Sequence, residues 1–384
     1  MRLIILGTRG IPARHGGFET FAEGLSLYLV KKGWEVTVYC QEKGTGPIYE
    51  DEWEGVKLIH VPVSAPGVLE TVLFDWKCTM HAKELKGPKL VLGYNTAIFS
   101  LPYRCRGQRC VINMDGIEWK RGKWGLAAKI WFFINEKVGL WLGHHLIADH
   151  PEIKNYLAKY VSRDKITVIP YTADILCSAD ERLLKPYNLL PGRYVLVIAR
   201  PEPENSILEI VKAYSRKKRD QPLVVLGQYV PELYSYHREV MRAASDEVIF
   251  AGALYDKELV NALRFYCRFY IHGHTVGGTN PSLVEALGAG SPVFAHDNKY
   301  NRWVAGAGAK YFTDEEHCAL QLDELLLRDH LITDMRKESR RRIEEKFTVD
   351  KVYGEYEKMF VLMQSYEIYQ HFEEQVGFMK NRFK

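Results

Sequence analysis

The chain has 384 residues, of which 47% are apolar and 26% are charged, and its formal net charge is +4. This length allows two domains of ordinary size, each with a buried core, and the composition excludes a disordered chain. The small net charge argues against a dedicated nucleic-acid-binding protein.

The cysteines and the hydrophobic pattern narrow the class further. The seven cysteines are scattered, with no CxxC pair and no histidine spacing typical of zinc, which predicts reduced thiols in the cytoplasm and no metal site. The sequence starts with the strand-like RLIILG instead of a signal peptide. No uncharged apolar run approaches the length of about 18 residues that a membrane span needs. We therefore expect a cytoplasmic protein, soluble or peripheral at the inner face of the cell membrane.

The first half of the chain alternates short apolar runs with helix-length segments, starting with a β-loop-α-β unit at 3–39. Such alternation predicts an α/β domain with a doubly wound parallel sheet. The expected strands are 3–6, 35–39, 57–61, 89–93, 109–114, 145–148 and 165–169, and the expected helices lie near 18–31, 68–85, 123–142 and 151–159.

A glycine-rich loop, GTRGIPARHGG, follows the first strand at 7–17. Its glycines do not fit the GxGxxG pattern, so binding of a nicotinamide dinucleotide is the weaker interpretation. Gly16 and Gly17 stand where a helix begins, with Arg14 and His15 beside them. A loop of this kind would suit a phosphate or a sugar.

The stretch KPYNLLPGR at 185–193 interrupts the alternation, and we place the interdomain linker there. The expected domains are 1–185 and 186–350, two Rossmann-like sheets that face each other across a ligand-binding cleft. The helical segment 351–384 is expected to pack back on the first domain. The strands expected after the linker are 194–198, 223–226, 248–250, 269–271, 293–295 and 310–312.

Two stretches of the second domain carry candidate chemistry at strand ends. Arg200 directly follows a strand, where it would bind a diphosphate or else form an ordinary surface salt bridge. In HGHTVGGTNPSLVEALGAG at 272–290, a loop with His272, His274 and adjacent glycines leads into a helix. Glu285, one turn inside that helix, would accept hydrogen bonds from a ribose hydroxyl, although glutamate near a helix start is also ordinary helix chemistry.

A third stretch, NMDGIEWKRGKWG at 113–125, belongs to the first domain. Asp115 stands in the turn at a strand's carboxyl end, where catalytic groups of α/β folds gather. The cations between Lys120 and Lys123 precede Trp124 and further aromatic residues. This pattern would suit a membrane interface, and the same aromatic residues would alternatively belong to the core.

These stretches together resemble a known family. The chain is similar to GT-B glycosyltransferases of family 4 and, within that family, to bacterial rhamnosyltransferases that add L-rhamnose during capsule and cell-wall polysaccharide assembly. The resemblance samples both expected domains, so it covers nearly the whole chain. The motifs that carry it are GTRGIPARHGGFETF at 7–21, NMDGIEWKRGKW at 113–124, ARPEPENSI at 199–207 and HGHTVGGTNPSLVEALG at 272–288.

The resemblance implies an acceptor-binding first domain, a nucleotide-sugar-binding second domain and a role for each candidate residue. Glu285 would hold the ribose, or the 3′-hydroxyl of a deoxyribose, and Arg200 would neutralise the donor diphosphate. Asp115 and His15 would position a sugar or handle a proton. The other implied binding positions are the backbone of Asn280, Pro281 and Ser282 at the diphosphate, Gly278 and His274 in the same loop, Leu254 and Tyr255 at the base, and Gly16 and Gly17 in the phosphate and acceptor loop.

Two positions depart from the broader family. Many members carry a further glutamate where this chain has Gly277, and many carry a lysine where it has Asn205. The missing carboxylate fits a donor with different hydroxyl geometry or a 6-deoxy sugar. The missing lysine leaves more of the phosphate charge to Arg200 and the helix N-terminus.

The resemblance thus implies a retaining, metal-independent transferase without a cofactor. It would move L-rhamnose from dTDP-L-rhamnose to a sugar on a polyprenyl diphosphate carrier. Its partners would be that donor, the lipid-linked acceptor and the membrane surface, the last through Lys120–Lys123, Trp124 and the neighbouring aromatic residues, with no nucleic acid. Two alternatives stay open: the same fold with another donor such as a UDP-hexose, and a non-catalytic subunit that binds a nucleotide sugar or a lipid carrier.

Overall fold

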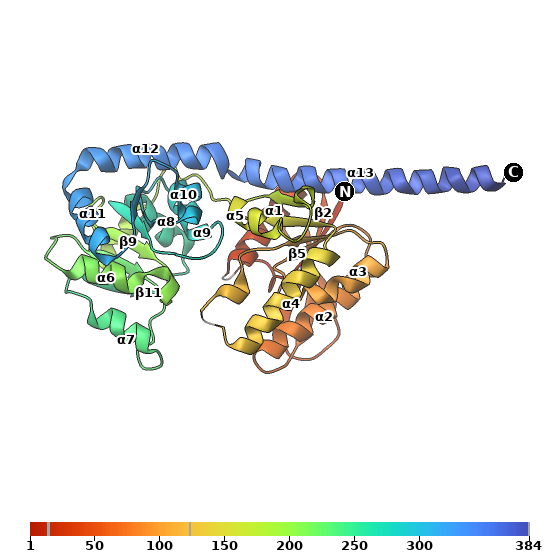
Figure 1. Cartoon of the computed structure of the whole chain (residues 1–384), viewed down its shortest axis with the longest axis horizontal. Coiled ribbons are helices and arrows are strands. Elements are labelled where there is room, and N and C mark those ends of the chain that lie inside the picture. Colours follow the sequence, from red (N-terminus) through yellow and green to blue (C-terminus); the bar gives the residue numbers. More distant parts are fainter. Residues whose placement is uncertain (14–15, 123, 383–384) are drawn as a thin grey trace. The chain divides into compact units, whose positions relative to one another are not determined.

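The chain forms two units, each built on a mostly parallel sheet (Figure 1). The computed structural model describes residues 1–13, 16–122 and 124–382, with side chains described as far as residue 365. The first unit comprises Met1–Ile169 and Tyr353–Lys384, and the second comprises Pro170–Val352.

The change from one unit to the other falls at Ile169, ahead of the stretch in which we placed the linker. That stretch overlaps the 3-10 helix η4 (Glu181–Tyr187). Leu184 is buried together with Leu189 and Tyr194 in a core of the second unit. The prolines and the glycine of the stretch are typical of a linker, but its apolar residues tie it to the second domain.

The sheet of the first unit has eight strands in the order β3-β4-β2-β1-β5-β6-β7-β8. Every neighbouring pair is parallel except β3 and β4. The short apolar runs of the sequence form the inner strands, because parallel strands are usually buried on both faces. The strands are β1 (Arg2–Leu6), β2 (Glu35–Lys43), β3 (Tyr49–Trp53), β4 (Val56–Val63), β5 (Lys89–Leu92), β6 (Cys110–Asn113), β7 (His145–Ala148) and β8 (Ile166–Val168).

The edge strand β3 was not expected from the sequence. It reads YEDEW and is exposed along nearly its whole length, so it shows neither an apolar run nor alternation. Its pairing with β4 makes it a strand. A charged edge of this kind discourages further pairing with other chains.

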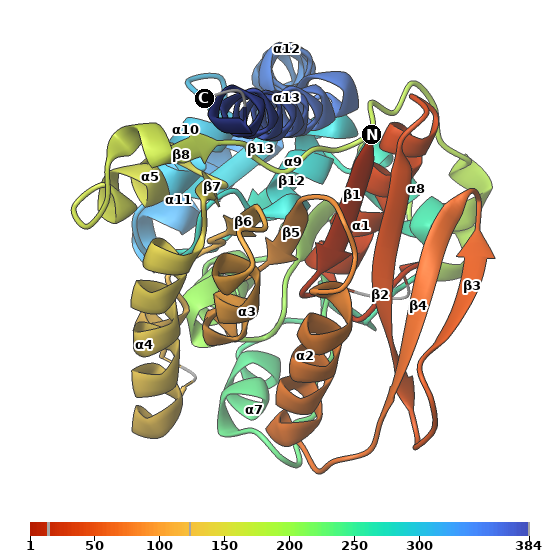
Figure 2. The same cartoon turned by 90° about the vertical axis from the view of Figure 1, so that its right-hand side faces the viewer.

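Helices flank this sheet, and Figure 2 shows α2, α3 and α4 next to one another beside it. The C-terminal helix packs on α1, where Phe21 contacts Tyr353 and Tyr356 with ring centroids 5.8 and 5.0 Å away. A Cβ on Gly24 would lie 2.3 Å from the Tyr353 hydroxyl, so glycine permits this close approach. The helices are α1 (Gly17–Val30), α2 (Val68–Ala82), η1 (Ala97–Ser100), α3 (Leu101–Cys105), η2 (Glu118–Lys120), α4 (Leu126–Leu142), α5 (Pro151–Leu157), η3 (Arg163–Lys165) and α13 (Val349–Arg382).

The sheet of the second unit has six strands in the order β11-β10-β9-β12-β13-β14, all parallel. The strands are β9 (Val195–Ile198), β10 (Leu223–Leu226), β11 (Val248–Gly252), β12 (Phe269–His272), β13 (Val293–His296) and β14 (Lys310–Phe312). The remaining helices are η5 (Pro203–Asn205), α6 (Ile207–Ser215), α7 (Ser235–Arg242), α8 (Lys257–Tyr266), α9 (Pro281–Gly288), α10 (Lys299–Ala305), α11 (Glu315–Leu327) and α12 (Asp329–Lys346).

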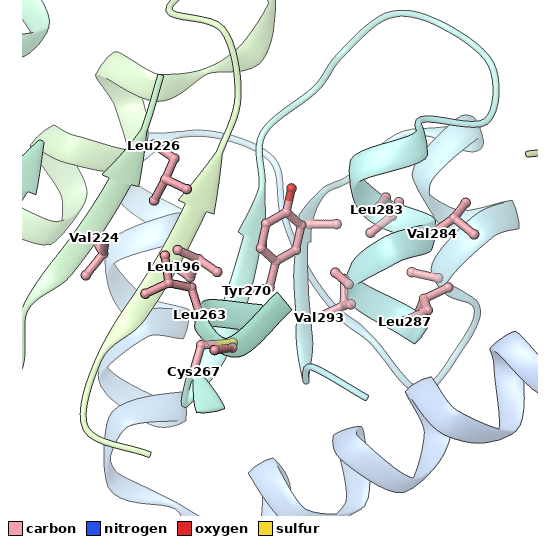
Figure 3. Packing of buried hydrophobic residues seen from close by; sticks show 14 of the residues in the cluster. Leu196, Val224, Leu226, Leu263, Cys267, Tyr270, Leu283, Val284, Leu287 and Val293 are labelled. Atoms are coloured by element: carbon pink, nitrogen blue, oxygen red, sulfur yellow. The ribbon is translucent and has the colours of Figure 1, made fainter. Parts of the chain in front are cut away.

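Alternate strand residues of the second unit bury on opposite faces. Leu196, Val224 and Tyr270 pack in one core with Leu263 of α8 and Leu283 of α9 (Figure 3). Their neighbours along the strands form the other core, which includes Val195, Val197, Val225, Phe269 and Ile271. This packing fixes α9 against the sheet and sets where its first turn lies. Among the described helices, none is long and apolar enough to cross a bilayer.

Candidate functional site

The second sheet gathers most of the candidate residues at one edge. Because all its strands run in the same direction, their carboxyl ends meet there, and ligands of open α/β sheets bind at such ends. Arg200 follows the central strand β9, the loop 273–280 follows β12 beside it, and Leu254 and Tyr255 follow the edge strand β11. The tertiary structure thus brings Arg200 and the glycine-containing loop to neighbouring strand ends.

Arg200 is exposed, and its guanidinium forms no hydrogen bond or ion pair with any residue that the structure describes. Its main chain is fixed, because the Arg200 carbonyl accepts hydrogen bonds from Asn205 Nδ2 at 2.8 Å and from the Glu202 N–H at 2.7 Å. Arg200 therefore forms no surface salt bridge with the described residues, which was the alternative role for this side chain. Asn205, in place of a lysine, holds the turn that presents Arg200.

The loop after β12 is anchored at its start by the η5 turn. A Cβ on Gly273 would lie 2.1 Å from the Asn205 carbonyl oxygen, so only glycine fits this close approach. The next anchor is Thr275, whose N–H and Oγ1 both donate to the Glu204 carbonyl at 2.9 Å. The His274 carbonyl accepts from Asn298 Nδ2 and Asn301 Nδ2, each at 2.9 Å.

The middle of this loop offers backbone donors. Gly277 has a φ of 119°, and a Cβ built there would meet nothing within 4 Å. Among the residues that the structure describes, the N–H groups of Gly277, Gly278 and Asn280 have no hydrogen-bond acceptor. Unpaired N–H groups in front of a helix are a favourable environment for an anion.

The first turn of α9 offers fewer backbone N–H donors to an anion than its sequence indicated. Pro281 has no N–H, and the Ser282 N–H donates to its N-cap, Asn280 Oδ1, at 3.0 Å. The Leu283 N–H donates to the Asn280 carbonyl at 3.1 Å. Of the three backbone positions that we had placed at the diphosphate, Pro281 has no donor and the Ser282 N–H is taken by the cap, whereas the Asn280 N–H is among the donors just ahead of the helix.

Below the loop lies a buried polar cluster. The Tyr270 hydroxyl lies 2.5 Å from Ser282 Oγ, 3.3 Å from His272 Nδ1 and 3.3 Å from the Ile198 carbonyl oxygen. His272 stacks on His274 with centroids 4.2 Å apart. Burial, and then the charge of His274, hold the pKa of His272 well below its usual value. His272 is therefore a neutral structural group, while His274 belongs to the loop.

Glu285 projects from α9 into an ion pair with Arg264 of α8. The Arg264 side chain is only 8% exposed, whereas that of Glu285 is 38% exposed. The pair involves Glu285 Oε2 and Arg264 Nη2. A buried cation thus orients the carboxylate and leaves it reachable from solvent. We did not predict Arg264 as a site residue, because the sequence marks it only as a cation among the apolar residues of ALRFYC.

Leu254 and Tyr255 precede the same helix, α8. Leu254 packs against the core of the second unit, whereas Tyr255 is 72% exposed. Asp256 caps the helix by accepting from the Leu259 N–H at 3.1 Å. The strand order separates this segment from Arg200 by the width of β10.

In the first unit, α1 fixes the loop at 7–17. Glu19 Oε1 accepts from the Arg9 N–H at 3.0 Å, and Glu23 Oε2 accepts from the Ala13 N–H at 2.6 Å. Gly16 is the N-cap of α1 and has a φ of 103°. Gly17 is the first residue of that helix.

His15 and Arg14 lie outside the described residues, and so does Lys123. The predicted roles of these three side chains stay predictions.

Asp115 lies just beyond β6 in a left-handed backbone conformation, with a φ of 46°. Its N–H donates to Asn113 Oδ1 at 3.0 Å, and Asn113 Nδ2 donates to the Tyr356 hydroxyl at 3.3 Å. Few non-glycine residues adopt such a conformation, and those that do concentrate at functional sites. The β6 edge therefore presents Asp115 in a held, strained turn.

The basic and aromatic segment after Asp115 is tied inward. Trp119 Nε1 donates to Glu136 Oε2 at 3.0 Å, and Trp124 Nε1 donates to Glu118 Oε2 at 3.0 Å. Glu118 also pairs with Arg121 at 2.8 Å. The indole N–H of Trp124, which we placed at a membrane interface, therefore faces a carboxylate of the same unit, as does that of Trp119. The sequence did not show this, because both acceptors are ordinary glutamates.

Among the described residues, no group of three or more His, Cys, Asp or Glu side chains is arranged to hold a metal ion.

Comparisons with known proteins complete the description. A family model described as a domain of unknown function, DUF1972, matches residues 1–174. A search of curated proteins found no match. The fold resembles sucrose-phosphate synthase from Thermosynechococcus elongatus, with a TM-score of 0.78 and 16% identity over 95% of this chain and 99% of that one.

Two further solved structures are similar. α,α-Trehalose 6-phosphate synthase from Burkholderia multivorans gives a TM-score of 0.74 at 11% identity, over 96% of this chain and 98% of that one. HepE from Anabaena, solved with UDP, gives 0.71 at 12% identity, over 94% and 100%. With its two doubly wound α/β domains, the chain therefore has the GT-B fold.

Proposed function

We propose that the protein is a glycosyltransferase that uses a nucleotide-sugar donor. The observation that carries this proposal is the carboxyl edge of the second sheet. There Arg200 and the N–H groups of Gly277 and Gly278, which have no partner among the described residues, follow neighbouring strands together with the carboxylate of Glu285. A nucleotide diphosphate offers anionic oxygens to the first two groups and ribose hydroxyls to the third.

The donor would be activated electrostatically. As the bond between the anomeric carbon and the diphosphate breaks, negative charge grows on the leaving oxygen, and fixed donors near it stabilise the transition state. The guanidinium of Arg200 presents its donors in a fork that matches phosphate. The anchored loop 273–280 holds its N–H groups in place before the substrate arrives, so little reorganisation is needed.

The sugar part of the proposal follows the resemblance to rhamnosyltransferases. In it, L-rhamnose moves from dTDP-L-rhamnose to a sugar on a polyprenyl diphosphate. The half-exposed Glu285 would accept from the 3′-hydroxyl of the deoxyribose. Gly277 places no carboxylate beside the sugar. Its φ of 119° also favours glycine at this position, because residues with side chains rarely adopt that conformation.

The chemistry proposed is transfer with retention at the donor's front face. The acceptor oxygen bonds to the anomeric carbon while the phosphate oxygen leaves, and a donor phosphate oxygen takes the acceptor proton. A protein base is then not required. Asp115 would orient the acceptor hydroxyl from the first domain, a role that fits its held turn at the end of β6.

Two alternatives remain for the test to decide. HepE was solved with UDP and with UDP and glucose, which favours a UDP-hexose donor as the second candidate. A subunit that binds a nucleotide sugar without turning it over is the third. Thermal shift with dTDP-rhamnose and with UDP-glucose identifies the donor, because a ligand that binds only the folded state raises the melting temperature.

Assays of donor hydrolysis and transfer with the same nucleotide sugars then separate an enzyme from a binding subunit. A shift with UDP-glucose alone would overturn the rhamnose donor. A shift without turnover, given a lipid-linked acceptor, would overturn the enzyme.

A further inference from the structure

Helix α4 exposes apolar side chains along most of its length. Leu126, Ile130, Phe133, Ile134 and Trp141 are between 42% and 76% exposed. Their spacing places them on one side of the helix, because residues three, four, seven and eight apart share a helical face. The opposite side is buried and includes Asn135, Gly139 and Leu142. The solvent side of α4 is therefore the kind of face that a surface helix normally hides.

This apolar face continues onto η1 and α3. Trp131 Nε1 donates to the Asn95 carbonyl at 2.8 Å, and the Ile98 N–H donates to Asn135 Oδ1 at 3.1 Å. These bonds hold η1 and the residue Asn95 ahead of it against α4, and Figure 2 shows α3 beside that helix. Ile98 and Leu101 are 40% and 43% exposed. The exposed apolar residues of α4, together with Ile98 and Leu101, are called the α4 surface below.

The charges around the α4 surface are mostly cationic. Arg104 of α3 lies over the Trp141 ring, 5.0 Å from its centroid, and donates to the Trp141 carbonyl at 3.1 Å. Lys129 and Lys137 belong to α4 itself. Lys137 forms an ion pair at 2.8 Å with Glu136, the one acid of α4, which is 1% exposed. No exposed acid of the helix offsets Arg104 and Lys129.

An anionic lipid bilayer fits this combination of groups better than a second copy of the chain does. A symmetric dimer through the α4 surface would place the same cations opposite one another, which is unfavourable. Apolar side chains can enter the acyl boundary while lysine and arginine meet lipid phosphates, and tryptophan favours the headgroup level.

We propose that the α4 surface binds an anionic membrane. This assignment replaces the inward-turned Trp124 by the exposed side chains of α4. Only the biological role of this membrane binding rests on the proposed function: it would bring a lipid-linked acceptor to the β6 edge. The link is direct within the first unit, because α4 begins just after the loop that carries Asp115. The binding itself is independent of any sugar chemistry.

The test is flotation of the full-length protein with vesicles of phosphatidylcholine alone and with one-third phosphatidylglycerol. We expect binding to the anionic vesicles and little to the neutral ones. Ile130→Glu with Ile134→Glu should lower the partition coefficient at least about tenfold, since each isoleucine loses favourable apolar burial. Lys129→Glu should lower it less, and added salt should weaken binding of the wild type.

The matched control is Leu327→Glu, which places the same charge on an apolar residue that is 83% exposed in the second unit. It should leave vesicle binding unchanged. Equal binding by the wild type and the double variant would overturn the proposal, and so would a wild type that does not bind anionic vesicles. A dimer that dissociates in the double variant would show a self-association surface instead.

Melting shifts with nucleotide sugars separate this proposal from the proposed function. The double variant should keep the donor-induced shift, because its substitutions lie in the first unit. If vesicle binding is lost and the melting shift is kept, only membrane binding has been affected. If the melting shift is absent and vesicle binding is kept, only the proposed donor binding is contradicted.

Discussion

The two units share an architecture and differ in which groups they present. The second unit presents polar groups at its sheet edge, where Arg200 and two glycine N–H groups have no partner among the described residues. The first unit pairs its polar groups inward, as Trp119 and Trp124 do with Glu136 and Glu118. It turns apolar side chains outward on α4 instead. We therefore propose that the same fold serves anion binding in one domain and surface attachment in the other, because function resides in loops and exposed faces.

The strongest test of this contrast is Arg200→Ala. We expect donor turnover to fall about 100- to 1,000-fold, the usual cost of losing one preorganised donor at a developing anion. The melting temperature should not change, because the guanidinium makes no bond that folding requires. Arg182→Ala is the matched control, since Arg182 is an exposed arginine of the same unit that pairs with Asp180. Unchanged turnover in Arg200→Ala would remove Arg200 from the diphosphate site.

Asp115→Asn tests the acceptor role that we propose for the first unit. Asparagine tolerates the left-handed conformation, so the fold should persist while the carboxylate is lost. We expect transfer to the acceptor to fall about 100-fold and donor binding to stay the same. Initial rates with a lipid-linked acceptor, together with donor melting shifts, measure the two effects. Weaker donor binding would contradict a division of labour between the domains.

The pair of Glu285 and Arg264 separates binding from stability. Glu285→Gln should weaken donor affinity about tenfold or more, and it should lower the free energy of unfolding, because it leaves a buried guanidinium without its carboxylate. Adding Arg264→Leu should recover stability without recovering affinity. Isothermal titration and urea unfolding of both variants give the comparison. Recovered affinity in the double variant would assign Glu285 to packing alone.

Gly277 is tested by two substitutions. Any side chain at a φ of 119° is strained, so Gly277→Ala and Gly277→Glu should each lose about 1–3 kcal/mol of unfolding free energy. A carboxylate that repels the rhamnose donor would reduce transfer by Gly277→Glu beyond the loss seen with alanine. Equal transfer by the two variants would mean that Gly277 matters only for its backbone conformation and not for the choice of donor.

The smallest effect is expected from the buried His272. Its pKa is held well below the usual value, so it is neutral in the folded state and becomes protonated on unfolding below about pH 6.5. The stability that it provides is present above that pH and is lost as the pH falls, by up to about 1.4 kcal/mol per pH unit. His272→Gln should flatten the dependence of unfolding free energy between about pH 6.5 and pH 5, and exposed His330→Gln should not.

Much of the fold could be predicted from local pattern. Short apolar runs separated by helical periods fix two parallel sheets, because each run must be buried on both faces. The same pattern locates Arg200, Asp115 and the loop after β12 at strand ends. The acidic β3 escaped prediction because nothing apolar marks it. The stretch at 185–193 resembled a linker because its prolines and its glycine are typical of one, and the burial of its leucines is visible only in the structure.

The sequence by itself therefore determined the architecture, the sheet edges that carry the candidate residues and the residue types that stand there. Only the tertiary structure decided which of those groups are free. Arg264 reaches Glu285 from another helix, Asn280 uses the first-turn N–H of Ser282, and two tryptophans turn toward glutamates. Local periodicity cannot specify such partners, because they come from residues that only packing brings together. For the same reason, the exposed apolar face of α4 became visible only in the folded chain.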